Sequence, residues 1–239
     1  FRGQMRRIEQ VLDLDHTTSL QVVDLGCGAG TNSSLWCEAG HTVVGVDILE
    51  KLVVTAAERA RARQEPATYL VGSAEALPLG DGWADVCLAP ELLEHVPDWQ
   101  GCLDEIARVL KPGGVVFLST TNTLCPRQAE FNLPLFSWYP GFVKRRVFEL
   151  TKASRPDLAN YAPYPAVNWF NVYSLGRALR ERGFSTVWTK YDLPQSDWPS
   201  SKQWISNVSA RSAIVRFALN ATSPGTQVYA RKSFHANAP

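Results

Sequence analysis

Short apolar runs alternate with amphipathic stretches over the first 121 residues of the chain. The runs are apolar on both faces or rich in β-branched residues, which predicts buried strands at 21–24 (extended by Leu20), 42–47, 67–71, 84–89 and 114–121. Helices are predicted between them, over 31–39, 50–63 and 99–110, the last stopped by the Lys-Pro-Gly-Gly segment 111–114. This alternation predicts an α/β fold with a doubly wound, mostly parallel sheet and helices on both faces.

The alternation stops after Thr121. Residues 122–172 contain six prolines and show no sustained period, and residues 192–223 are similarly irregular. A helix over 174–182 and strands over 184–191 and 227–232 complete a seven-stranded Rossmann-like sheet. Because long insertions in compact domains are usually functional, we expect one domain over 1–239 with cap insertions at about 122–172 and 192–223, the first rich in aromatic residues.

Composition narrows the class of protein. The 239 residues include 24 basic and 23 acidic side chains, and a net charge of +1 gives no overall field that would attract nucleic acid. A nucleic-acid substrate is also not expected because the fourth strand is followed by Ala-Pro-Glu and not by the D/N-P-P-Y/F motif. The sequence contains no run of 18 apolar residues, so no membrane-spanning helix is predicted. The five cysteines form no C-x-x-C pair, and a cytoplasmic location is the simplest expectation.

The strongest chemical signal is the strand-to-helix junction at 22–31, which reads V-V-D-L-G-C-G-A-G-T. Alternating glycines let the backbone turn sharply and let a ligand lie against the main chain. A dinucleotide fingerprint would need a glycine where Thr31 stands, and the carboxylate of Asp24 would repel a pyrophosphate. That carboxylate suits a ligand with an amino group and a sulfonium. Asp47 ends the second strand, where it can accept both ribose hydroxyls, although an ordinary helix N-cap remains an alternative.

Five motifs follow one another along the chain: D-L-G-C-G-A-G at 24–30, V-D at 46–47, G-S-A-E-A-L-P at 72–78, L-L-E-H-V at 92–96 and L-K-P-G-G at 110–114. Together they resemble the class I S-adenosylmethionine-dependent methyltransferases, in particular the ubiquinone-biosynthesis type O-methyltransferases and related small-molecule enzymes. The resemblance covers about residues 5–121 well, and 174–191 and 226–232 less closely. It implies that S-adenosyl-L-methionine is the cofactor and that the acceptor is a small molecule.

The resemblance also implies which residues bind the cofactor. The glycine segment would hold the methionine end, the second strand the ribose and adenine, and the third strand the adenine edge. The fourth strand would close the pocket beneath the methyl group. In that order, the expected residues are Asp24, Gly26, Cys27, Gly28 and Gly30, then Asp47 and Ile48, then Ser73, Ala74 and Glu75, and finally Ala89 and Pro90. The family usually has an aspartate where Ser73 stands, so the adenine amine would have a shorter acceptor here.

Glu91, Glu94 and His95 follow the fourth strand. If a helix begins at Glu91, the three side chains fall at i, i+3 and i+4 on one face. His95 is then a candidate general base for a substrate hydroxyl, with Glu91 or Glu94 orienting it. A divalent metal site and a structural packing role for His95 stay open as alternatives, and the sequence alone assigns no metal ligand.

Aromatic residues are concentrated in the first cap, where ten of the chain's 25 lie within 131–170. Residues 136–150, FSWYPGFVKRRVFEL, join several of them to the basic cluster Lys144-Arg145-Arg146. Three interpretations stay open. The cap is a lid that separates an apolar acceptor from water, a segment that touches a membrane surface, or a satellite core packed on the sheet.

The sequence thus predicts S-adenosylmethionine-dependent O-methylation of a small aromatic or lipid-like acceptor, by in-line displacement at the sulfonium. Methylation of nitrogen or carbon is one alternative, and a non-catalytic cofactor-binding protein is another. No nucleic-acid partner is expected, whereas peripheral membrane contact and the oligomeric state stay open.

Overall fold

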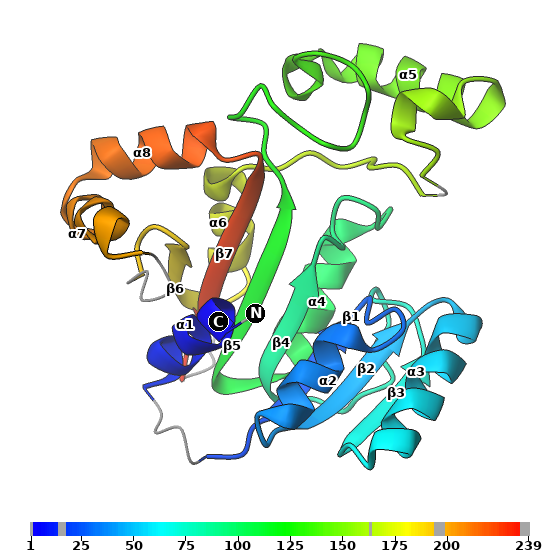
Figure 1. Cartoon of the computed structure of the whole chain (residues 1–239), viewed down its shortest axis with the longest axis vertical. Helices are drawn as coiled ribbons and strands as arrows, with labels where there is room; N and C mark the ends of the chain where they lie inside the picture. The colour runs from blue at the N-terminus through cyan, green and yellow to red at the C-terminus, as the bar shows by residue number, and fades with distance from the viewer. Residues whose placement is uncertain (1, 14–17, 163, 194–198, 235–239) are drawn as a thin grey trace.

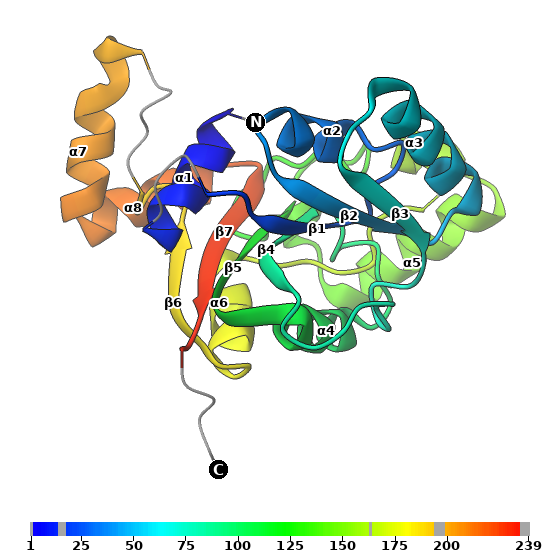
Figure 2. The same ribbon diagram turned by 90° about the horizontal axis from the view of Figure 1, so that it is seen from below.

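A computed structural model of the protein describes residues 2–13, 18–162, 164–193 and 199–234. Its centre is a seven-stranded sheet with the order β3-β2-β1-β4-β5-β7-β6 (Figures 1 and 2). Strands β1 to β5 are parallel, and β7 runs antiparallel to both β5 and β6. The strands are β1 (Gln21–Leu25), β2 (Thr42–Asp47), β3 (Ala67–Val71), β4 (Ala84–Pro90), β5 (Leu110–Thr121), β6 (Phe184–Thr189) and β7 (Gly225–Lys232). The predicted mostly parallel, doubly wound sheet is confirmed.

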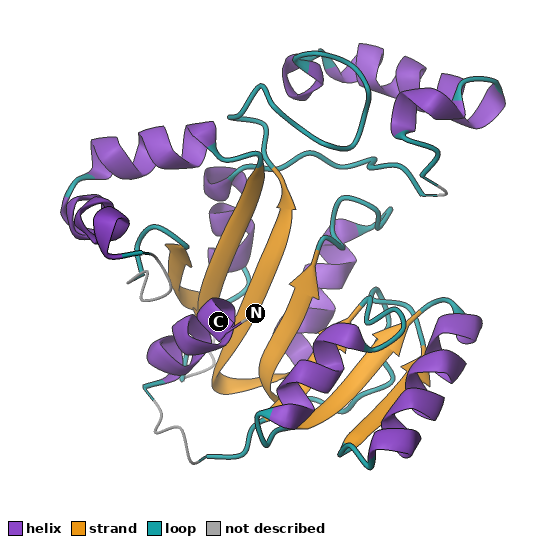
Figure 3. Ribbon diagram, viewed as in Figure 1, coloured by secondary structure: helices purple, strands orange, loops and turns teal. Residues whose placement is uncertain are grey.

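Helices cover both faces of this sheet. Helices α1 (Arg2–Leu12), α2 (Thr31–Glu38) and α3 (Glu50–Arg63) lie on one face, and α4 (Trp99–Val109) and α6 (Val172–Arg180) lie on the other (Figures 1 and 3). Helix α6 begins two residues earlier than predicted because Asn171 caps it, accepting hydrogen bonds from the backbone of Tyr173 and Ser174. The Lys-Pro-Gly-Gly segment does end α4, and it continues directly as the extended start of β5.

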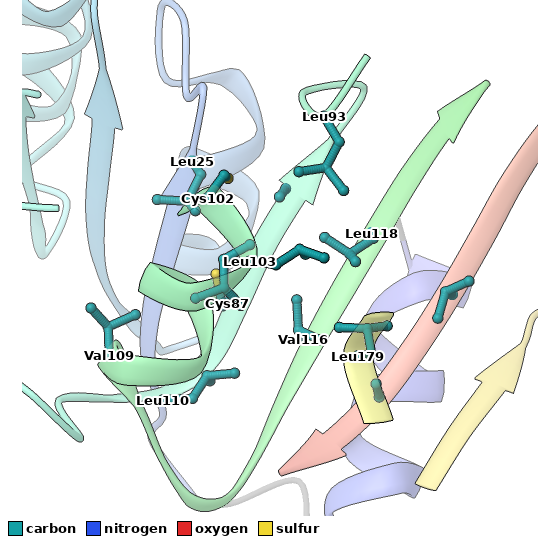
Figure 4. Packing of buried hydrophobic residues seen from close by; sticks show 14 of the residues in the cluster. Leu25, Cys87, Leu93, Cys102, Leu103, Val109, Leu110, Val116, Leu118 and Leu179 are labelled. Carbon is teal, nitrogen blue, oxygen red and sulfur yellow. The ribbon is translucent and has the colours of Figure 1, made fainter. Parts of the chain in front are cut away.

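Side chains alternate along the strands between two hydrophobic clusters. In β1, Val22 belongs to the cluster that includes α1 and α2, whereas Val23 belongs to the cluster that includes α4 and α6. Figure 4 shows the second cluster, in which Cys87 of β4 and Leu103 of α4 lie together. Both faces of the central strands are therefore buried, which explains why the strands read as continuous apolar runs. All five cysteines are free and buried.

Both segments that were predicted to be irregular contain helices. The first contains α5 (Gly141–Ala153) and two 3-10 turns, η1 (Phe136–Trp138) and η2 (Pro156–Ala159). The second contains η3 (Ser200–Lys202), α7 (Gln203–Arg211) and α8 (Ala213–Thr222). Residues 194–198 of this predicted segment lie outside the described residues. The prediction was wrong because the apolar side chains do not form one buried stripe: Phe142 of α5 is 68% exposed and Ile214 of α8 is 82% exposed.

The segment that carries α5 lies beyond the carboxyl ends of the parallel strands (Figure 1). It leaves and re-enters the sheet at one place, where Thr123 N donates to Phe170 O at 2.7 Å. Its aromatic residues form a third cluster, with the Phe131 and Phe136 ring centroids 4.3 Å apart and Trp169 beside them. A satellite core therefore exists, but it is built from cap residues alone. Within the described ranges, no helix is long and apolar enough to cross a membrane.

Candidate active site

A cleft of about 760 Å³ opens at the carboxyl end of the sheet, between the β1, β2, β3 and β4 loops and the cap. Ligands of open α/β sheets bind at this edge. The sheet and its loops supply Leu25, Gly26, Val46, Asp47, Ile48, Leu49, Gly72, Ser73, Ala74, Glu75, Leu92, His95, Val96 and Pro97, and the cap supplies Glu130, Ala162 and Tyr164. Six of the twelve expected cofactor residues and one of the three expected catalytic residues thus share one cavity.

The glycine segment adopts a backbone that favours glycine. Gly26, Gly28 and Gly30 all have positive φ angles, between 54° and 78°. At Gly30 a Cβ atom would also lie 2.6 Å from the Tyr69 hydroxyl, so the third glycine lets β3 and α2 pack closely. Gly28 N donates to Asp47 Oδ2 at 2.9 Å, which ties the segment to the end of β2.

Asp47 is held in place by the backbone on both sides. Besides the bond from Gly28, its Oδ1 accepts from Leu49 N at 2.9 Å. Asp47 is not the N-cap of α3, because Leu49 occupies that position. Each carboxylate oxygen keeps a further lone pair, so the residue can still accept ribose hydroxyls. Ile48, 71% exposed at the cleft, offers the apolar surface that a planar base needs.

Asp24 lies beneath the glycine segment and not on the cleft surface. It is only 1% exposed, and its two oxygens accept from Ser33 Oγ at 2.7 Å and Asn32 Nδ2 at 3.3 Å. Burial raises the pKa of Asp24 to about 6, because the hydrogen bonds offset only part of the desolvation. A buried carboxylate in this state would be stabilised by a nearby cation such as an amino group. Sequence reasoning missed Asn32 and Ser33, which follow the glycines in the first turn of α2.

The β3 loop is fixed to the start of α4. Ser73 Oγ accepts from Glu75 N at 3.2 Å, and Glu75 Oε1 accepts from Asp98 N at 2.9 Å. Ala74 lies between them on the cleft wall. These two hydrogen bonds fix the conformation of the loop at the wall of the cleft.

Five expected cofactor residues besides Asp24 are absent from the cleft lining: Cys27, Gly28, Gly30, Ala89 and Pro90. Ala89 is fully buried in the sheet. Leu92, Val96 and Pro97, which follow β4, line the cleft instead. Burial raises the pKa of the Cys27 thiol to about 12, so this cysteine is neutral and behaves as a small apolar side chain.

No helix begins at Glu91, so the condition for placing the three side chains on one helical face is not met. Glu91 N instead donates to Ser119 O at 2.8 Å, continuing the pairing of β4 with β5, and Glu91 has a φ of 48°. The chain then turns back until α4, so Glu91, Glu94 and His95 do not share a helical face. In the part of the chain that the structure describes, no group of three or more His, Cys, Asp or Glu side chains is arranged to hold a metal ion.

The two carboxylates of this turn are engaged away from His95. Glu91 Oε1 accepts from Ser119 Oγ at 2.5 Å, and Glu94 Oε2 accepts from Thr120 Oγ1 at 2.8 Å. Burial raises the pKa of Glu94, and the neighbouring Glu91 carboxylate raises it further. Glu94 is thus stabilised in its neutral form. The Nδ1 atom of His95 is buried without a hydrogen-bond partner, and the residue lines the cleft.

The cap is bonded directly to the turn that carries His95. Asn168 Nδ2 donates to Leu93 O at 2.9 Å and to Val96 O at 2.6 Å, so it spans the turn on both sides of His95. The backbone N–H groups of Val167 and Asn168 both donate to Glu94 O. Sequence reasoning missed these contacts and the cap residues of the cleft, because no local pattern marks where a long insertion folds back.

Residues 23–118 match the family described as "Methyltransferase domain". Over these residues the match confirms the resemblance to the S-adenosylmethionine-dependent methyltransferases that the motifs indicated. The match ends before the cap begins.

Among curated proteins, a ubiquinone biosynthesis O-methyltransferase of Methylococcus capsulatus is 41% identical over 103 residues, which cover 43% of this chain and 44% of that protein. A malonyl-[acyl-carrier protein] O-methyltransferase of Serratia marcescens is 36% identical over 100 residues, 42% of this chain and 38% of that protein. The chain thus matches less than half the length of both relatives. Among solved structures, an S-adenosylmethionine-dependent methyltransferase from Mesorhizobium loti shares the fold, with a TM-score of 0.61 and 21% identity over 96% of this chain and 98% of that one.

Proposed function

We propose that the protein transfers a methyl group from S-adenosylmethionine to a hydroxyl group of a small, uncharged, aromatic or lipid-like acceptor. One observation carries the proposal: Gly26 and Asp47, the expected cofactor contacts, line the same cavity as His95. A donor held by the first two residues and a hydroxyl beside His95 would therefore meet inside one cleft. Residues 122–172 and 192–223 act in this proposal as caps of a single methyltransferase domain over 1–239.

The chain's own residues would bind the cofactor along the strand ends. From its buried position beneath the glycine segment, the Asp24 carboxylate would balance the positive charge of the cofactor's amino group. Asp47 would accept the ribose hydroxyls, and Ile48 would cover the adenine. The bound cofactor supplies a methyl group on a sulfonium. Placing the acceptor oxygen about 3 Å from that methyl, in line with the sulfur, supplies most of the rate.

His95 would act as the general base of this reaction. Its Nδ1 atom is buried without a hydrogen-bond partner and the residue lines the cleft, so in this proposal Nε2 takes the proton of the acceptor hydroxyl. The turn that carries His95 is fixed by Asn168, which keeps the ring in place.

The charges of the cleft favour an uncharged acceptor. The described lining residues include the carboxylates of Asp47, Glu75 and Glu130, and none of them is a lysine or an arginine. A carboxylate or phosphate on the acceptor would face these like charges, and no lysine or arginine of the described lining could pair with it. This supports a neutral hydroxyl over the malonyl carboxylate that the name of the Serratia relative suggests.

The test is a methyl-transfer assay with hydroxylated aromatics, prenylated phenols, the matching amines and a malonyl thioester. We expect transfer to a phenolic hydroxyl, and a loss of about 10²-fold or more in turnover for His95→Ala, with unchanged affinity for S-adenosylhomocysteine. His41→Gln is the matched control, since His41 is buried before β2, at the opposite edge of the sheet from Asp47.

Other outcomes would contradict specific parts of the proposal. Near-normal turnover of His95→Ala would remove His95 as the base. Transfer to the amines alone would replace O-methylation by N-methylation. Tight cofactor binding without transfer to any acceptor would support a non-catalytic cofactor-binding protein.

A further inference from the structure

His95 lacks the carboxylate partner that its own motif was expected to supply. Glu91 accepts a hydrogen bond from Ser119, and Glu94 accepts one from Thr120. Glu94 is also stabilised in the neutral form, so it cannot balance a positive charge on the imidazole. A histidine that takes a proton in a largely apolar cleft becomes a cation, and a nearby anion stabilises that cation.

Glu130 of the cap is the carboxylate placed to do this. It lines the same cleft as His95 and is half-buried there. Within the described residues its carboxylate makes no hydrogen bond and no ion pair, unlike Glu75, which is bonded to Asp98 N. An acidic side chain that reaches a cleft with no partner of its own is available to a group inside that cleft.

Glu130 and His95 line the same cleft, and the charges of His95 and Glu91 act on the Glu130 carboxyl group. Burial raises the pKa of Glu130, a positive charge on His95 lowers it, and the charge of Glu91 raises it. The other titratable groups of the cleft lining are Asp47, Glu75 and Tyr164. Protonation of His95 therefore favours the ionised form of Glu130, and the ionised Glu130 favours protonation of His95.

We propose that Glu130 is the charge partner of His95, supplied by the cap, which stabilises the imidazolium that forms during methyl transfer. The inference rests on the proposed function. As the new bond forms between the acceptor oxygen and the methyl carbon, the acceptor O–H bond breaks and its proton passes to Nε2 of His95. The sulfonium becomes a neutral thioether, so the positive charge moves to the imidazole, where Glu130 faces it.

This pairing makes the cap part of the reaction site. Glu130 and His95 belong to different segments, and the bonds from Asn168 to the turn around His95 hold those segments together. The role is that of a positioning and charge-balancing residue, since Glu130 acts on the acceptor through His95.

The test uses the full-length protein without an acceptor. The chain has four histidines, so their imidazole signals can be followed by NMR titration and that of His95 assigned from its loss in His95→Ala. In Glu130→Gln we expect the His95 signal to titrate at a lower pH than in the wild type, because the imidazolium loses an anion. Glu149→Gln, which removes an exposed carboxylate from α5 of the same cap, should leave it unchanged. Glu130→Asp should restore part of the shift.

The kinetic readout follows from the same charge. In Glu130→Gln, kcat should fall by about threefold or more because a less basic His95 accepts the proton less readily, and the acidic limb of its pH profile should move to lower pH. Affinity for S-adenosylhomocysteine, measured by calorimetry, should not change.

An unchanged His95 titration in Glu130→Gln, or an equal change in Glu149→Gln, would overturn the pairing. This failure is distinguishable from failure of the proposed function. A His95→Ala variant with normal turnover refutes the base, whereas the NMR titration reports on the Glu130–His95 pair whichever reaction the protein catalyses.

Discussion

Asp24 makes the stability of the cofactor-free protein depend on pH. Its carboxyl group is buried beneath the glycine segment, and burial raises its pKa from 3.8 to about 6. The folded protein therefore binds a proton more tightly than the unfolded chain does at this position. Stability from this group is fully present below pH 3.8 and is lost as the pH rises through 6.

The size of the effect follows from these two pKa values. A difference of about two pH units, at 1.36 kcal/mol per unit, corresponds to about 3 kcal/mol, most of it between pH 4 and pH 7. Asp24→Asn keeps the shape but cannot ionise. We therefore expect the variant's free energy of unfolding, relative to the wild type, to rise by about 3 kcal/mol over this range.

Urea unfolding of both proteins at half-unit steps between pH 4 and pH 7 measures this difference, and other titrating groups cancel because both proteins contain them. The same change should weaken cofactor binding, because asparagine cannot neutralise an amino group. Stability and affinity should thus move in opposite directions at pH 7. Parallel pH profiles for the two proteins would refute the reasoning about burial, and unchanged cofactor affinity would refute the role proposed for Asp24.

Two further predictions concern the cap. Asn168→Ala removes the hydrogen bonds to both carbonyls around His95, so it should lower the free energy of unfolding by about 1–3 kcal/mol and also lower turnover. Asn132→Ala, the control, loses a hydrogen bond to Asp157 O inside the cap and should leave turnover unchanged. Arg145 and Arg146 are exposed, so replacing both with glutamate should reduce co-sedimentation with anionic vesicles, and a wild type that stays in the supernatant would reject the membrane interpretation.

The structure revises which part of the basic cluster can act at a surface. Lys144 Nζ donates to Ser137 O at 2.7 Å and lies 4.3 Å from the centre of the Trp169 ring. Desolvation lowers the pKa of Lys144 to about 8. This lysine therefore belongs to the interior of the cap, which reduces the exposed charge of the cluster to its two arginines.

The aromatic residues of the cap also divide in a way that their sequence does not show. Phe131, Phe136 and Trp169 pack against one another, while Trp138 and Phe142 are exposed. Tyr164 lines the cleft. Among the described cap residues, Tyr164 is the aromatic residue that lines the cleft, and Glu130 and Ala162 line it too. The aromatic residues of the cap therefore contribute one side chain to the cleft lining that the structure describes.

The parts of the fold that could be predicted from the sequence are those in which apolar residues recur regularly along an element. Helix α3 and strands β2 and β3 have the predicted bounds, because each is either apolar throughout or has one apolar side. The loops that line the cleft could be placed for a related reason, since parallel strands bring their carboxyl ends to one edge of the sheet. Helices α7 and α8 could not be found this way, because exposed apolar residues such as Ile214 hide their period.

The error at Glu91 has a different cause. The spacing of Glu91, Glu94 and His95 is compatible with a helix, but spacing does not show where a strand stops pairing. Here the Glu91 N–H continues the pairing with Ser119, and its positive φ then turns the chain away from helical geometry. Glu130 could not be predicted at all, since its place in the cleft lining depends on how the cap folds back over the sheet.

The bond between Thr123 N and Phe170 O closes the cap at its base. A segment whose two ends already meet adds almost nothing to the strain of the sheet, whatever its length or internal structure. The length of the segment between these two residues can therefore change at little cost, whereas the bonds from Val167 and Asn168 to the turn around His95 have to be kept for that turn to hold its place.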